Sequence, residues 1–130
     1  MNASELIAIA QRARRYARAD YSKFKVGAAL ETVGGDVFTG CNIENSTYGL
    51  TICAERVAMF KAISEGQKKF RRIAVAFDTH APTPPCGACR QLLWEFAGDI
   101  EIILATLKGR SMSHHLGDLL PMPFDKRFLK

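Results

Sequence analysis

The spacing of apolar residues along the chain predicts three long helices and one short helical turn. In the first helix, one apolar stripe is formed by Leu6, Ile7, Ala10, Ala13 and Ala17. Asn2 stands where the N-cap of this helix is expected, and Glu5 follows it at the spacing of a capping box. We expect the helices over about residues 3–19, 53–66 and 86–97, and the turn over residues 115–120.

Four runs of apolar and β-branched residues predict strands. Gly34-Gly35-Asp36 separates the first two runs and predicts a β-hairpin, because these residues tolerate a positive φ. The third run is almost continuously apolar, which is typical of a central strand. The expected strands are residues 26–32, 37–43, 72–77 and 101–105. The order α-β-β-α-β-α-β therefore predicts an α/β fold, a three-layer α/β/α sandwich with a mixed central sheet.

Composition agrees with a single domain over residues 1–130. The 130 residues are 48% apolar and 24% charged, which suits one globular domain and is too little for two. Residues 1–5 lack the basic flank and apolar run of a signal peptide. No stretch approaches the roughly 18 consecutive apolar residues of a membrane span. We therefore expect a cytoplasmic protein with no membrane partner.

The net charge of +5 is concentrated in two basic clusters. A nucleic-acid groove would interleave such charge with aromatic side chains, and Tyr16 and Phe70 are the only candidates here. We interpret both clusters as solvated surface and expect no nucleic acid polymer as a partner. The clusters are Arg12, Arg14, Arg15 and Arg18, and Lys68, Lys69, Arg71 and Arg72.

The most informative chemical signal is a set of three cysteines with one carboxylate. Cys53 and Glu55 are followed later by Cys86 and Cys89. Catalytic zinc sites keep three protein ligands and leave the fourth position for water, and a Glu beside that water can move protons. Cys86 and Cys89 share one face at a helix start, whereas Cys53 must lie at or just before the first turn of its helix to converge with Glu55. The pattern predicts a hydrolytic zinc site between two helix N-termini, whose dipoles lower the thiol pKa values.

Two arginines next to this set are candidates for tuning its charge. Three thiolates around Zn²⁺ leave a net negative charge, which weakens the pull of the metal on its water. Arg56 follows Glu55 and Arg90 follows Cys89, so each could hydrogen-bond to sulfur and withdraw charge. A surface ion pair is the alternative for each arginine.

Two other uses of the cysteines compete with this interpretation. A structural zinc site needs a fourth ligand, but Cys41 fits better as a small buried residue of its strand. The histidines lack ligand spacing to the cysteines; they are His80, His114 and His115. Disulfides are disfavoured because no secretion signal accompanies the cysteines. Asn42 and Glu44, two residues apart near a strand end, could hold a polar small molecule through hydroxyls or could simply form a turn.

With these residues in view, the chain resembles the small, single-domain cytidine deaminases, whose chemistry is established for zinc deaminases in general. The resemblance covers nearly the whole chain. It rests on residues 21–29 (YSKFKVGAA), 38–45 (FTGCNIEN), 53–56 (CAER), 85–91 (PCGACRQ) and 119–121 (LLP). It implies the cytidine deaminase-like fold and a hydrolase of pyrimidine salvage. The implied reaction converts cytidine and 2′-deoxycytidine to uridine and 2′-deoxyuridine with release of ammonia.

The resemblance also assigns roles residue by residue. Glu55 would take a proton from water and deliver it to N3 of the ring and then to the leaving ammonia. Phe24 looks like the aromatic wall of the base pocket, and Asn42 and Glu44 match the residues that hold the ribose. The backbone of Ala54 would contact the edge of the pyrimidine. The Zn²⁺ ligands would be Cys53, Cys86 and Cys89.

Members of the small class are typically homotetramers whose sites are completed by neighbouring subunits. By that similarity, Tyr48 and Phe124 are expected to reach across to a neighbour. Pro84 departs from the family pattern, which commonly has Ser there, and we expect it to change only the stiffness of the loop.

Three other functions are weighed against this one. A deaminase of a cytosine-nucleoside antibiotic such as blasticidin S shares the cysteine segments, but the pair of Asn42 and Glu44 favours an ordinary nucleoside. An editing deaminase would need additional elements to hold a strand of RNA or DNA. A non-enzymatic domain, stabilised by zinc or active in redox chemistry, would have no use for Glu55.

Overall fold

The computed structural model describes residues 1–129 and has a five-stranded sheet at its centre. The strands are arranged in the order β2-β1-β3-β4-β5. β3 and β4 pair in parallel and the other neighbours are antiparallel, so the predicted mixed sheet is confirmed. The strands are β1 (Val26–Thr32), β2 (Val37–Cys41), β3 (Phe70–Phe77), β4 (Glu101–Thr106) and β5 (Ser111–His115).

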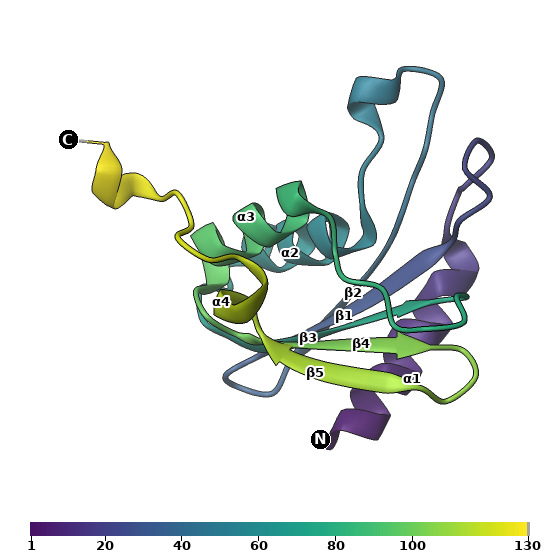
Figure 1. Cartoon of the computed structure of the whole chain (residues 1–130), viewed down its shortest axis with the longest axis horizontal. Coiled ribbons are helices and arrows are strands. Elements are labelled where there is room, and N and C mark those ends of the chain that lie inside the picture. The colour runs from purple at the N-terminus through teal and green to yellow at the C-terminus, as the bar shows by residue number, and fades with distance from the viewer. Residues whose placement is uncertain (130) are drawn as a thin grey trace.

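Helices cover both faces of the sheet and complete the three predicted layers (Figure 1). On one face, Leu6 and Ala10 pack against Ala29 and Ala74. On the other face, the second and third α-helices bury the opposite side of the same strands, because neighbouring residues of a strand point to opposite faces. The α-helices are α1 (Ala3–Ala13), α2 (Ala54–Ser64), α3 (Gly87–Ala97) and α4 (Leu116–Leu119), and the 3₁₀ turns are Arg14–Tyr16, Tyr48–Leu50 and Lys126–Phe128.

The first helix is shorter than its apolar spacing predicts. The α-helical part ends at Ala13 instead of near residue 19, although the predicted N-cap is present, since Asn2 Oδ1 accepts from the Glu5 N–H at 2.9 Å. Arg18 pairs with the segment that follows β2, because its N–H donates to the Asn42 carbonyl at 3.0 Å. The backbone groups that would extend the helix are therefore used to join this segment to the chain that follows β2.

The fifth strand was not predicted. β5 consists of Ser111, Met112, Ser113, His114 and His115, and most of it is exposed at the edge of the sheet. An exposed polar strand carries no alternating apolar signal, so only its pairing with β4 reveals it. The predicted helical turn at residues 115–120 is confirmed as α4 over Leu116–Leu119.

Two glycines set how closely helices approach the sheet. A Cβ atom added to Gly27 would lie 2.1 Å from the Ala10 carbonyl oxygen of α1, and one added to Gly40 would lie 2.3 Å from the Ala54 carbonyl oxygen of α2. Both obstacles are backbone atoms, which cannot move aside as a flexible side chain can. The backbones of α1 and α2 therefore rest directly on β1 and β2.

We expect Gly27→Ala to lower the free energy of unfolding by about 3 kcal/mol or more, because α1 must move away from β1. Urea unfolding followed by far-ultraviolet circular dichroism measures this loss. Gly34→Ala is the matched control, since the nearest atom to its added Cβ is at 3.9 Å, and we expect a change within about 0.5 kcal/mol. Equal stability of the two variants would contradict the close contact.

Among residues 1–129, no helix has both the length and the apolar character that crossing a bilayer requires.

Candidate active site

The starts of α2 and α3 bring three cysteines together. Cys53 is the N-cap of α2 with extended backbone angles (φ −78°, ψ 154°), which confirms that it precedes the first helical turn. Cys86 is the N-cap of α3, and Cys89 lies one turn later with its N–H directed at the Cys86 sulfur. The three Sγ atoms all lie within 4.8 Å of one another.

This cluster suits a zinc ion. Zn–S bonds of about 2.3 Å in a tetrahedral site place the sulfurs roughly 3.8 Å apart, so a small inward shift of the side chains would complete the coordination. All four cysteines are free thiols. Both helix N-termini direct their N–H dipoles toward the sulfurs, which favours the thiolate form that binds metal.

The protein groups shift the pKa values of Cys53 and Cys89 in opposite directions. A hydrogen bond from Cys89 lowers the pKa of Cys53 to about 5, and Arg56 contributes through a hydrogen bond and its charge. The same contact, together with burial, raises the pKa of Cys89. Arg56 Nη2 lies 3.1 Å from Cys53 Sγ, as expected of an arginine that withdraws charge from the sulfur.

Arg90 is placed differently from its expected contact with sulfur. Its Nε donates to the Pro85 carbonyl at 2.8 Å, and its Nη1 donates to the Leu119 carbonyl at 2.8 Å. The guanidinium thus joins the loop before Cys86 to the chain at the end of α4. Its hydrogen bonds in the structure go to backbone carbonyls, so it supports the position of a ligand loop and not the charge on a sulfur.

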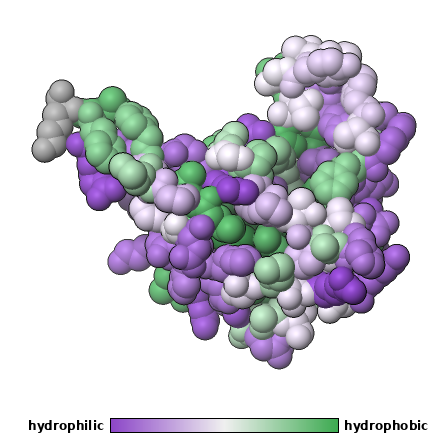
Figure 2. Space-filling model, viewed as in Figure 1, coloured by the Kyte–Doolittle hydropathy of each residue, from purple (hydrophilic) through white to green (hydrophobic). Residues whose placement is uncertain are grey.

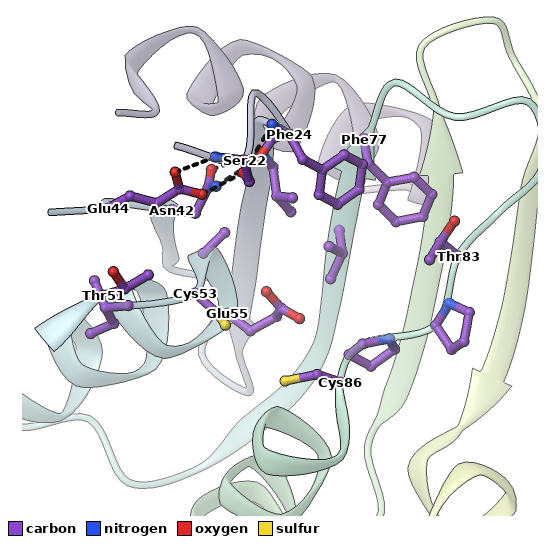
Figure 3. Close-up of a pocket in the computed structure, with 16 residues that line it drawn as sticks. Ser22, Phe24, Asn42, Glu44, Thr51, Cys53, Glu55, Phe77, Thr83 and Cys86 are labelled. Carbon is purple, nitrogen blue, oxygen red and sulfur yellow. Dashed lines mark hydrogen bonds between the residues drawn. The ribbon is translucent and has the colours of Figure 1, made fainter. Parts of the chain in front are cut away.

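Glu55 lies in the first turn of α2 beside the cysteine cluster. Its side chain points into a cavity (Figure 3), and the residue is only 5% exposed. Burial raises the pKa of this carboxyl group to about 7, and the negative charge of Cys53 adds to the rise. A carboxyl group that can both accept and donate a proton near neutral pH is suited to general acid–base chemistry.

The cavity has a volume of about 330 Å³, enough for a small organic molecule. Several of the predicted site residues line it, from segments far apart in the sequence: Phe24, Asn42, Glu44, Cys53, Ala54, Glu55 and Cys86. Cys89 is fully buried and is not among the residues that line the cavity. Other lining residues were not predicted from the sequence, among them Ser22, Thr51, Val75, Phe77 and Thr83. Of these residues, Phe77 could most easily have been predicted from the sequence. It ends the central strand β3, and ligands bind near strand ends in α/β folds.

Asn42 and Glu44 both line the cavity, and both also hold the loop that carries Phe24. β2 ends at Cys41, before either residue, so the predicted strand to residue 43 is too long. Asn42 accepts from the Val26 N–H at 2.9 Å and donates to the Phe24 carbonyl at 2.7 Å. The Glu44 carboxylate accepts hydrogen bonds from Tyr21 and Ser22.

Tyr48 and Phe124 lie outside this cavity. Tyr48 packs edge-on against Tyr21 with ring centroids 5.8 Å apart. Both tyrosines line a smaller hollow that shares Ser22, Glu44 and Thr51 with the main cavity. Phe124 belongs to the C-terminal tail, and its carbonyl accepts a hydrogen bond from Gln91 on α3. Each is strongly exposed, at 75% for Tyr48 and 55% for Phe124.

Comparisons with known proteins agree with this chemistry. A family model described as the cytidine and deoxycytidylate deaminase zinc-binding region matches residues 1–106. A cytidine deaminase of Sporosarcina psychrophila is 48% identical over 99% of this chain and 96% of its own length. One from Halalkalibacterium halodurans is 48% identical over 95% of both chains. The crystal structure of cytidine deaminase from Burkholderia pseudomallei superposes with a TM-score of 0.93 at 48% identity, covering 95% of this chain and all of that one.

Proposed function

The chain belongs to the cytidine deaminase family. We propose that residues 1–130 form one zinc-dependent deaminase domain, and that residues of the cavity described above carry out the reaction. The reaction converts cytidine or 2′-deoxycytidine and water to uridine or 2′-deoxyuridine and ammonia. The observation that supports the site most strongly is a cluster of three thiols, two of which, Cys53 and Cys86, line the same cavity as the buried carboxyl group of Glu55. The zinc ligands are Cys53, Cys86 and Cys89.

Bound zinc supplies the Lewis acidity that makes water nucleophilic at neutral pH. Glu55 then accepts a proton as water oxygen attacks C4 of the ring, and it donates a proton to N3. Glu55 next takes the proton of the new hydroxyl group on C4 and delivers it to the amino nitrogen as the C4–N bond breaks, so that C4 becomes the uridine carbonyl and ammonia leaves. A carboxyl group with a pKa near 7 can serve both directions of transfer. Arg56 withdraws negative charge from the Cys53 sulfur through its hydrogen bond.

The remaining cavity residues bind the nucleoside. Phe24 forms an aromatic wall for the ring, and the Ala54 backbone at the start of α2 contacts the pyrimidine edge. Asn42 and Glu44 hold the sugar hydroxyls at the opposite rim. Glu44 supports this role because its carboxylate lies at the cavity surface and the loop leaves about one acceptor position free, on Oε2.

We expect 2′-deoxycytidine to be a good substrate and free cytosine a very poor one. Each lost hydrogen bond to a charged or buried partner costs about 1.5–3 kcal/mol, so losing both sugar contacts lowers kcat/KM by roughly 10²–10⁴-fold. Release of ammonia from the two nucleosides and the free base measures this directly. Similar kcat/KM for cytosine and cytidine would remove the sugar role from Asn42 and Glu44. Blasticidin S in the same assay tests the antibiotic alternative, and we expect cytidine to be strongly preferred.

We propose that the protein is a homotetramer with sites completed by neighbouring subunits. Apolar side chains are exposed on the outer surfaces of α2 and α3 and along the C-terminal tail. The tail extends away from the body of the protein and carries apolar residues (Figures 1 and 2). These residues are Phe60, Ile63 and Phe96 on the helices, and Met122, Phe124, Phe128 and Leu129 on the tail. Tyr48 and Phe124 are the candidates to reach a neighbouring site.

Light scattering after size exclusion should give about four times the chain mass of 14.4 kDa. We expect Phe124→Asp to lower the tetramer fraction and the activity together, because it places a charge in the apolar contact. Val33→Asp is the matched control, since Val33 is a 64% exposed apolar residue in the distant turn after β1. A monomeric wild-type protein with full activity would contradict shared sites.

The cellular setting that we propose is pyrimidine salvage in the cytoplasm. Glu44 lies at the rim of the cavity, and its negative charge would repel a phosphate group. The cavity therefore suits an uncharged nucleoside better than a phosphorylated one. Growth of a pyrimidine auxotroph on cytidine, with and without the gene, tests the role, and cell fractionation tests the location.

A further inference from the structure

The aromatic wall of the cavity is held by hydrogen bonds more than by packing. Phe24 is 39% exposed, so neighbouring side chains cover only part of it. Its backbone is fixed from both sides instead. The Phe24 N–H donates to Ser22 Oγ at 3.0 Å, and the Phe24 carbonyl accepts from Asn42 Nδ2 at 2.7 Å.

Ser22 links Phe24 to the sugar side of the cavity. Its hydroxyl accepts from the Phe24 N–H and donates its single proton to Glu44 Oε2, which uses both capacities of a hydroxyl group. The Ser22 N–H also donates to Glu44 Oε1 at 2.9 Å. These bonds hold the pKa of Glu44 below its usual range, so the acceptor stays ionised and the bonds are charge-assisted. Figure 3 shows Ser22 between Glu44 and Phe24.

The backbone between Ser22 and Phe24 needs such support. Lys23 has a φ of 62°, in the left-handed region that residues other than glycine rarely adopt. A strained conformation of this kind persists only where the surroundings fix it. The hydrogen bond between Ser22 and Phe24 joins the two neighbours of Lys23, and the bond from Ser22 to Glu44 anchors this turn to the chain after β2.

On the basis of the function proposed above, we infer that Ser22 is a positioning residue: its hydroxyl fixes Phe24 against the pyrimidine ring and joins the ring wall to the sugar contact at Glu44. The wall touches the ring both before and during reaction. Its displacement therefore weakens substrate and transition state alike, which raises KM and leaves kcat nearly unchanged.

Ser22→Ala is the direct test, with steady-state kinetics on cytidine and calorimetric affinity for the product uridine. We expect KM and the uridine Kd to rise roughly tenfold, the worth of one charge-assisted hydrogen bond, while kcat stays within about threefold. Zinc content should remain that of the wild type. Ser22→Thr keeps the hydroxyl and should restore KM to within about threefold. Ser64→Ala is the matched control, an exposed serine at the far end of α2 whose hydroxyl bonds the Lys61 carbonyl.

A double-mutant cycle separates positioning from a direct contact. If Ser22 acts through Phe24, adding Ser22→Ala to Phe24→Ala should raise KM by clearly less than Ser22→Ala does in the wild type, because only the bond to Glu44 is then left to lose. An undiminished effect in that background, an unchanged KM for Ser22→Ala, or a loss of zinc in it would each overturn the inference. Wild-type activity on cytidine reports separately on the proposed function, because its absence would refute that function whatever Ser22 does.

Discussion

Glu55→Gln should retain zinc and fold while losing more than about 10⁴-fold in kcat. The three thiols are untouched by this change, and glutamine has the size and shape of the buried carboxyl group that it replaces. One positioned proton transfer is worth about 10²–10⁴-fold, and Glu55 serves more than one transfer in the same reaction. The amide can still hydrogen-bond to the ring, so the affinity for cytidine should persist or increase.

The measurements are zinc content, cytidine affinity and single-turnover rate on one preparation. Glu65→Gln is the matched control, because it makes the same chemical change at the exposed C-cap of the same helix. It should leave all three quantities within error of the wild type. A Glu55→Gln variant with activity within tenfold of the wild type, or one that lost its zinc, would overturn the proton-transfer role.

Cys89→Ala should lose zinc and activity together. Cys89 is fully buried, and its sulfur belongs to the cluster in which all three Sγ atoms lie within 4.8 Å. Two remaining thiolates cannot hold the ion with comparable affinity, because each ligand contributes to the binding free energy. Metal analysis after dialysis and an ammonia-release assay provide the two readouts.

Cys41→Ala separates this effect from the general cost of deleting a thiol. Cys41 is a free cysteine on β2 outside the cluster, and the variant should keep both zinc and activity. Stoichiometric zinc in purified Cys89→Ala, or its loss from Cys41→Ala, would count against the ligand assignment.

Local rules predicted the parts of the site that depend on local geometry. Cys53 and Glu55 are two residues apart, so they can face one cavity only if one of them precedes the helix, and Cys53 is indeed an extended N-cap. Cys86 and Cys89 share a face for the ordinary helical reason. The hairpin between β1 and β2 followed from its glycine turn, and the bounds of β1 agree with its apolar run.

Features that depend on long-range pairing were not predicted. β5 is polar and exposed, and it exists because β4 offers an open edge. The position of Arg90 next to Cys89 predicted a hydrogen bond to sulfur. In the folded chain, the Arg90 guanidinium donates to the Leu119 carbonyl instead. Ser22 lines the cavity together with Phe77 because the sheet order sets β1 beside β3, and no local pattern around Ser22 encodes that order.

The close contact at Gly40 has a consequence for how this enzyme can change. The helix start that carries Cys53 and Glu55 rests on the backbone of β2, so the reacting groups are positioned by a direct contact between backbone atoms. The sugar side is built differently, from two connecting segments at residues 17–25 and 43–52 that are tied to each other by side chains. Substrate preference and chemistry are therefore encoded in separable modules. Laboratory evolution that randomises these two segments alone should yield variants with altered nucleoside preference that still carry one zinc ion per chain.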